Sequence, residues 1–193
     1  MTTTDEQDKS DSDLLAAVAT ADMAAFEALY RLYERRVYQY AYTFVRDRTV
    51  AEEVAVDTMT AVWHGAAGFA GRSRASTWIL GITRHKALDA VRKGARQARQ
   101  VALEDAARVA DSGPTQSETV ATHQAGQLTR RAMAAMTPDH QEILRLVFFE
   151  ELPYEEIAAL LVIPANTVKT RVYYAKQQLK QHLERLARQE AEE

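Results

Sequence analysis

Apolar side chains recur every third or fourth residue along nearly the whole chain, and this spacing constrains the fold more than any other feature. The clearest run lies near the C-terminus, at Val168, Val172, Ala175, Leu179 and Leu183. Glycine and proline, which interrupt helices, are sparse among the 193 residues. No segment shows a convincing strand pattern. The sequence therefore predicts an all-α protein.

The apolar pattern weakens once, and this break predicts the domain organisation. A chain of 193 residues has room for one domain or two small ones. The segment DSGPTQSET at 111–119 is polar and rich in turn-forming residues. We therefore expect two small helical domains joined by a flexible linker: a disordered acidic tail at 1–13, a first domain at 14–97, the linker at 98–127 and a four-helix second domain at 128–188.

Helix boundaries follow from capping residues and from the apolar stripes. Asp13 is a candidate N-cap for the first helix, and Thr137 followed by Pro138 predicts another helix start. Two further helices are expected over 24–46 and 49–64. Another should begin at Ser76 or Thr77, after a glycine-containing loop.

The residue inventory argues against an enzyme. Cysteine is absent, so disulfides, thiol catalysis and thiolate metal sites are excluded. HExxH, GxSxG and glycine-rich phosphate-binding motifs are missing as well, and the five histidines are scattered. We expect neither a cofactor nor a metal. The polar N-terminus and the lack of a long apolar run predict a cytoplasmic protein without membrane insertion.

Charge is distributed unevenly, although the formal net charge is only -3. Acidic residues concentrate at the two ends of the chain, whereas basic residues concentrate at 84–99 and at 169–188. Either basic segment alone is more often the solvated face of an amphipathic helix. Two of them suggest two separate contacts with one nucleic acid.

Residues 153–180 read as two short helices joined by a tight turn, with a basic second helix. This is the pattern of a helix-turn-helix, whose second helix enters the major groove of DNA. The alternative is an ordinary helical hairpin with solvated lysines.

Most of the chain resembles the ECF (extracytoplasmic-function) sigma factors, the two-domain initiation subunits of bacterial RNA polymerase. FEALYRLYERRVY at 26–38, AEEVAVDTMTAVW at 51–63 and STWILGITRHKALDAVRK at 76–93 resemble the promoter-melting domain. The stretch at 137–179 resembles the domain that reads the upstream promoter element. The chain departs from the family at Val56, His85, Asn166 and Tyr174. Asn166 replaces the turn glycine, and asparagine tolerates the left-handed backbone expected there.

The resemblance implies contacts with the upstream (−35) element by the second helix of the helix-turn-helix. Lys169 and Thr170 would read bases, Tyr173 would make an apolar contact, and Arg171 and Lys176 would hold phosphates. The full candidate set is Asn166, Thr167, Lys169, Thr170, Arg171, Tyr173, Tyr174 and Lys176.

The first domain is expected to recognise and melt the downstream (−10) element. Its loop would capture an unpaired base, and the following helix would line the path of the single strand. The candidates are Phe69, Arg72, Arg74, Trp78, Arg84, His85, Lys86, Asp89, Arg92 and Lys93. Trp78 is more often a core residue in such a position. An Asp89–Arg92 ion pair on a solvated helix face is the alternative for that region.

The implied partners are core RNA polymerase and promoter DNA, and the resemblance also admits an anti-sigma factor. Glu52, Glu53, Asp57 and Trp63 would dock on the clamp helices of the polymerase largest subunit, unless they form a solvated helix face. The competing function is a stand-alone helix-turn-helix regulator that does not engage polymerase. The promoter sequence and the activating signal do not follow from the residues.

Overall fold

The computed structural model describes residues 3–104 and 123–191, and every regular element within these ranges is a helix. The chain divides into two compact units, Met1–Ala110 and Asp111–Glu193. This confirms the prediction of an all-α protein with two small helical domains.

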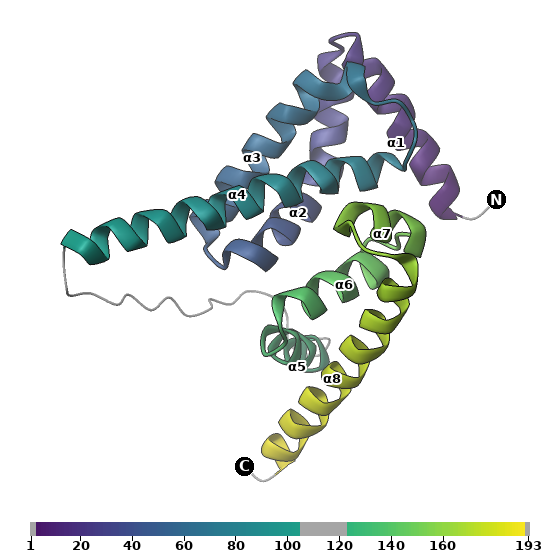
Figure 1. Ribbon diagram of the computed structural model, residues 1–193. Coiled ribbons are helices and arrows are strands. Elements are labelled where there is room, and N and C mark those ends of the chain that lie inside the picture. The colour runs from purple at the N-terminus through teal and green to yellow at the C-terminus, as the bar shows by residue number, and fades with distance from the viewer. Residues whose placement is uncertain (1–2, 105–122, 192–193) are drawn as a thin grey trace. The chain divides into compact units, whose positions relative to one another are not determined.

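The first unit is built on three long helices (Figure 1). Helix α2 (Met23–Val45) packs against α3 (Arg48–Gly65) and α4 (Ala75–Glu104), and α3 also packs against α4. Helix α1 (Thr3–Ala19) lies against α2, α4 and the short 3-10 helix η1 (Ala66–Gly68). The loop between η1 and α4 therefore runs beside α1 (Figure 1).

Local capping explains where α2 and α3 begin. The Asp22 carboxylate accepts hydrogen bonds from the amides of Ala24 and Ala25, at 2.9 and 3.1 Å. The Asp47 carboxylate accepts one from the amide of Val50 at 2.9 Å. The apolar stripes then close a core that includes Leu15, Val18, Leu29, Tyr33, Val37, Met59, Val62 and Ile79.

The prediction of a disordered tail at 1–13 is wrong from Thr3 onward, because α1 begins there. Asp13 is consequently not an N-cap but an exposed residue inside α1. The acidic half of this helix is held by tertiary contacts of Asp8 and Asp11, which replace the apolar anchors that the sequence lacks there.

The second unit contains α5 (His123–Ala134), α6 (Pro138–Phe148), α7 (Tyr154–Leu161) and α8 (Ala165–Ala191). Helix α8 packs against the other three. Thr137 occupies the N-cap position of α6, and Pro138 lies in the first turn, as predicted. The threonine side chain makes no capping hydrogen bond. The buried residues include Ile143, Leu144, Leu146, Ile157, Val168, Val172 and Ala175.

The expected linker at 98–127 is too long at both ends. Helix α4 continues to Glu104, and α5 begins at His123. The remaining expected linker residues, 105–122, lie outside the described part of the chain. The C-terminal half of α4 extends past the ends of α2 and α3 (Figure 1), and residues 91–99 are exposed on every side of the helix.

Candidate nucleic-acid interface

The turn between α7 and α8 sets the direction of the basic helix. Val162 ends α7 in the left-handed conformation, with φ 56° and ψ 49°, and its amide bonds back to the carbonyls of Ala158 and Ala159. The expectation that Asn166 occupies the left-handed position is wrong. Asn166 lies in the first turn of α8, after Pro164, whose carbonyl accepts from the amide of Thr167 at 2.8 Å.

The exposed face of α8 carries most of the residues predicted to contact DNA. Lys169, Thr170, Tyr173 and Tyr174 are all exposed, because Val168, Val172 and Ala175 take the buried side. The two tyrosine rings meet edge to face with centroids 5.5 Å apart, and each is 59% exposed. This face thus presents a cation, a hydroxyl and two aromatic rings over two turns, a combination suited to base edges and thymine methyl groups.

Hydrogen bonds within α8 modify what its first turns offer. The Thr170 hydroxyl donates to the carbonyl of Asn166 at 3.0 Å, which leaves its methyl group and oxygen lone pairs for a partner. Asn166 is exposed and Thr167 is half-buried. Asn166 can therefore reach a ligand directly, whereas Thr167 has less free surface.

Arg171 and Lys176 flank the exposed face rather than lying at its centre. The Arg171 guanidinium lies 3.7 Å from the carboxylate of Asp139 at the start of α6. The Lys176 ammonium lies 4.9 Å from the centroid of the Phe148 ring, a cation–π contact that leaves the charge near the surface. Cations in flanking positions can contact phosphates on either side of a groove.

Gln177 is a candidate that the sequence analysis missed. It is exposed and lies one turn beyond Tyr173 and two turns beyond Thr170, so it continues the same face. The signal in the sequence is its helical spacing from Thr170 and Tyr173, since its side chain is neither charged nor aromatic. A glutamine amide can pair with an adenine edge or with a phosphate.

The loop before α4 in the first unit is fixed at its Phe69 end by aromatic packing. The Phe69 ring lies 5.3 Å from the Trp78 ring, and both residues pack on the core of the unit. A Cβ added to Gly65 would lie 3.5 Å from the Trp78 ring. Trp78 is therefore a half-buried packing residue in this structure, in agreement with the core alternative.

The rest of that loop is open. Gly71 adopts φ 63°, a conformation that L side chains rarely adopt, and nothing approaches the position where a Cβ would sit. Arg72 is exposed, while Arg74 is half-buried immediately before α4. The loop thus offers an open backbone and an exposed guanidinium.

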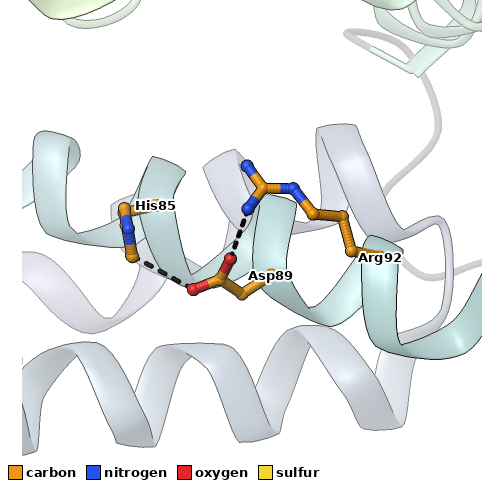
Figure 2. Close-up of polar contacts among 3 residues, drawn as sticks. All are labelled: His85, Asp89 and Arg92. Atoms are coloured by element: carbon orange, nitrogen blue, oxygen red, sulfur yellow. Dashed lines mark hydrogen bonds and ion pairs between the residues drawn. The ribbon is translucent and has the colours of Figure 1, made fainter.

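Three candidate residues on α4 form one polar chain (Figure 2). The Asp89 carboxylate lies 3.3 Å from Nδ1 of His85 and 2.9 Å from the guanidinium of Arg92. The Asp89–Arg92 ion pair that the alternative interpretation of this region includes is therefore present. All three side chains are more than half exposed, so the pair adds little stability and mainly orients Arg92 along the helix.

Basic residues continue along α4 on both sides of this chain. Arg84 and Lys86 are half-buried, whereas Lys93 is exposed. Arg96 and Arg99 follow Arg92 at helical spacing and are exposed on the part of α4 that extends past α2 and α3. The structure therefore lengthens the basic surface beyond the residues assigned from sequence.

The acidic candidates lie on α3. Glu52, Glu53 and Asp57 are exposed, as predicted. Trp63 is different, because it is half-buried and meets the Phe26 ring edge to face at 5.0 Å. The three carboxylates are thus available to a partner, while the indole mainly packs on the core of the unit.

Metal sites and membrane-spanning helices are both absent from residues 3–104 and 123–191. Within these ranges no group of three or more histidine, aspartate or glutamate side chains could hold a metal ion. None of the helices described combines the length and hydropathy needed to cross a membrane. The exposed basic and aromatic surfaces therefore remain the main features to explain.

Comparisons with known proteins cover both units. Residues 29–97 match the family Sigma-70 region 2, and residues 127–179 match Sigma-70, region 4. The chain is 31% identical over 183 residues to the ECF RNA polymerase sigma factor RpoE of Cereibacter sphaeroides, an alignment that covers 93% of this chain and 99% of that protein. It is 28% identical over 163 residues to the RNA polymerase sigma factor YlaC of Bacillus subtilis, covering 82% of this chain and 92% of the relative.

Two solved structures share the fold. One is the sigma factor RpoE in complex with the anti-sigma factor NepR from Bartonella quintana, with a TM-score of 0.65, 22% identity, and coverage of 82% of this chain and 96% of that one. The other is CnrH in complex with the cytosolic domain of CnrY, with a TM-score of 0.62, 20% identity, and coverage of 90% and 97%.

Proposed function

The chain belongs to the ECF RNA polymerase sigma factors, and from this premise we propose how its surfaces divide the work of initiation. It is a transcription initiation factor that binds core RNA polymerase, recognises two promoter elements and starts transcription. One observation supports the assignment of a different promoter element to each unit. Each unit has its own exposed basic helical face, on α4 and on α8, and each face lies in a segment matched by a different sigma region.

The second unit reads the upstream promoter element with α8. Lys169, Thr170 and Tyr173 face the base edges, and Arg171 and Lys176 hold phosphates on either side. Arg171 must exchange its contact with Asp139 for a phosphate, which is feasible because the pair is 3.7 Å long and Asp139 is well exposed. Tyr174 and Gln177 extend the contact along the groove.

The first unit captures the downstream element as it melts. The open loop around Gly71 allows close approach of a nucleotide, and Arg72 attracts the backbone beside it. His85, Arg92 and Lys93 then guide the strand along α4. Extruding a base costs a few kcal/mol and base capture returns about 1–3 kcal/mol, so polymerase contacts must supply the remainder.

Core polymerase is engaged through the acidic face of α3. Glu52, Glu53 and Asp57 offer exposed negative charge to a basic partner surface, which the family places on the clamp helices of the largest subunit. Trp63 contributes mainly by holding α3 against the core. The protein acts in the cytoplasm with polymerase, and an anti-sigma factor restrains it, as suggested by the fold shared with RpoE in its complex with NepR.

A stand-alone helix-turn-helix regulator is the weaker candidate. Such a protein needs no promoter-melting domain, whereas residues 29–97 match Sigma-70 region 2. The loop provides the sharpest experimental distinction. Arg72→Ala should reduce formation of open complexes by holoenzyme on duplex promoter DNA, as seen by permanganate reactivity of unpaired thymines.

A template with a pre-melted bubble should recover part of that loss, because the melting cost has already been met there. The matched control is Arg35→Ala, which removes an exposed arginine from α2. Equal bubble formation by wild type and Arg72→Ala would make the loop a simple connector.

A further inference from the structure

Helix α4, which carries the basic face of the first unit, is capped by a residue from a distant part of the chain. The Asp8 carboxylate accepts a hydrogen bond at 3.0 Å from the amide of Ala75, the first residue of α4. The residue immediately before α4 is Arg74, whose side chain has donors only and cannot accept from the helix amides. The cap at the Ala75 amide therefore comes from α1.

Further contacts hold α1 in the position that this cap requires. The Asp11 carboxylate is buried and accepts hydrogen bonds from the Tyr33 hydroxyl and, at 2.8 Å, from the Gln7 amide. Leu15 and Val18 are buried in the core one and two turns later. The acidic half of α1 is thus anchored by polar contacts and the apolar half by packing.

The Asp8 contact lies at the second end of the loop that we assign to base capture. At the first end, Phe69 packs on Trp78. Between these two ends lie the open backbone at Gly71 and the exposed Arg72. The two ends of the loop are therefore held by an aromatic contact at Phe69 and by a hydrogen bond from α1 at Ala75.

We propose that Asp8 is a positioning residue for promoter melting, because it holds the Ala75 end of the loop and so presets the conformation that receives the unpaired base. Helix α1 acts as a brace for this loop. The proposal rests on the proposed function of the loop. It goes further, since it assigns a role in DNA melting to α1, a helix that carries none of the residues we assign to DNA contact.

Substitutions at Asp8 separate this role from a general effect on folding. Asp8→Ala removes the acceptor, whereas Asp8→Asn keeps an oxygen that can accept the same hydrogen bond. Asp13→Ala is the matched control, because it removes one exposed carboxylate from the same helix. Buried Leu15 and Val18 should keep α1 helical in all three variants, which circular dichroism of the full chain would check.

The test uses holoenzyme on a duplex promoter and on the same promoter with a pre-melted bubble. Asp8→Ala should lower open-complex formation on duplex DNA about fivefold, the factor that corresponds to one lost N-cap hydrogen bond. The bubble template should recover most of this loss. Asp8→Asn and Asp13→Ala should match wild type on both templates.

The outcomes distinguish this proposal from the loop function on which it rests. Suppose that Arg72→Ala lowers open-complex formation on duplex DNA, that the bubble template recovers it, and that Asp8→Ala has no such effect. The brace is then refuted, while the capture loop stands. The brace is also refuted if Asp8→Ala lowers open-complex formation equally on both templates, because Asp8 then acts through general folding. It is refuted as well if Asp8→Asn causes the same loss as Asp8→Ala, because the charge of Asp8 is then what matters. If neither variant affects melting, both the brace and the capture loop are wrong.

Discussion

The hydroxyl of Tyr33 donates a hydrogen bond to the buried carboxylate of Asp11, and this contact ties α2 to α1 inside the first unit. The Arg36 guanidinium lies 4.6 Å from the centroid of the same ring. Burial raises the pKa of the Tyr33 hydroxyl, and the hydrogen bond to Asp11 raises it further. Tyr33 therefore remains a protonated donor well above neutral pH.

This raised pKa predicts a loss of stability at alkaline pH. The folded state holds the Tyr33 proton more tightly than the unfolded state, so the stabilisation is complete below the ordinary tyrosine pKa of about 10 and falls as pH rises above it. Tyr33→Phe should flatten this decline and cost about 1–3 kcal/mol at neutral pH, because the buried Asp11 carboxylate loses the hydrogen bond from the Tyr33 hydroxyl and keeps the one from Gln7. Urea unfolding followed by circular dichroism at several pH values measures both effects. Identical alkaline slopes for the two proteins would exclude Tyr33 as the source.

Val162 gives a second stability prediction. A β-branched residue in the left-handed conformation costs about 1–2 kcal/mol, and Val162 is 87% exposed, so little packing offsets this strain. Val162→Gly should therefore raise the free energy of unfolding by up to about 1 kcal/mol. The gain is smaller than the strain itself, because glycine also increases the conformational entropy of the unfolded chain. Val56→Gly is the control, because Val56 is exposed within α3, where glycine should cost about 1 kcal/mol. A loss for both variants would contradict the strain at Val162.

Lys169 and Lys176 should differ in the kind of DNA contact they make. Lys169→Ala should relax selectivity at one position of the upstream element, because Lys169 lies on the outward face of α8. Lys176→Ala should weaken binding evenly across sequences and lower the salt slope by about one, because the lysine sits at the flank beside Phe148. Binding of holoenzyme to promoter variants at several salt concentrations separates the two. Equal, sequence-independent losses would remove Lys169 from the base-reading residues.

The acidic face of α3 should govern affinity for core polymerase. Glu53→Lys combined with Asp57→Lys should weaken core binding strongly, and Glu53→Gln with Asp57→Asn should give an intermediate loss, because complementary charge sets orientation and association rate. Both pairs should leave the circular dichroism spectrum and thermal melting near wild type, since these side chains are exposed. Asp13→Lys on α1 controls for net charge in the neutralised pair, because both changes make the net charge more positive by two units. If the reversal variant binds core polymerase with unchanged affinity, these residues form a solvated helix face with no role in polymerase binding.

The apolar stripes allowed most of the helices to be predicted. They predicted helices over 24–46 and 49–64, and the structure has α2 at Met23–Val45 and α3 at Arg48–Gly65. The N-terminal half of α1 was missed because its stability depends on tertiary partners. The Asp8 carboxylate accepts a hydrogen bond from the Ala75 amide, and the Asp11 carboxylate accepts one from the Tyr33 hydroxyl. A local sequence pattern does not indicate pairs so far apart in the chain. The end of the first domain was placed too early, at 97, for a related reason. Residues 91–99 bury no apolar face, so no apolar stripe marks the C-terminal part of α4, which continues to Glu104.

The candidate site was predictable to a similar degree. Side chains whose role follows from helical spacing, such as Lys169 and Tyr173, appear on the exposed face as expected. Side chains whose partners lie on other elements did not follow from sequence: Trp63 packs on Phe26, and Arg171 reaches Asp139. The left-handed position of Val162 was also missed, because its residue type argues against that conformation.

Reconstituted transcription tests the central claim most directly. Core RNA polymerase would be mixed with this protein and with genomic DNA fragments of the source organism, and transcript starts would be mapped with and without the protein. The account predicts new, specific starts that share two upstream sequence elements, and it predicts that Lys169→Ala and Arg72→Ala reduce them through different elements. No specific transcript from any fragment, together with no capture of core polymerase by the protein, would contradict its function as a sigma factor.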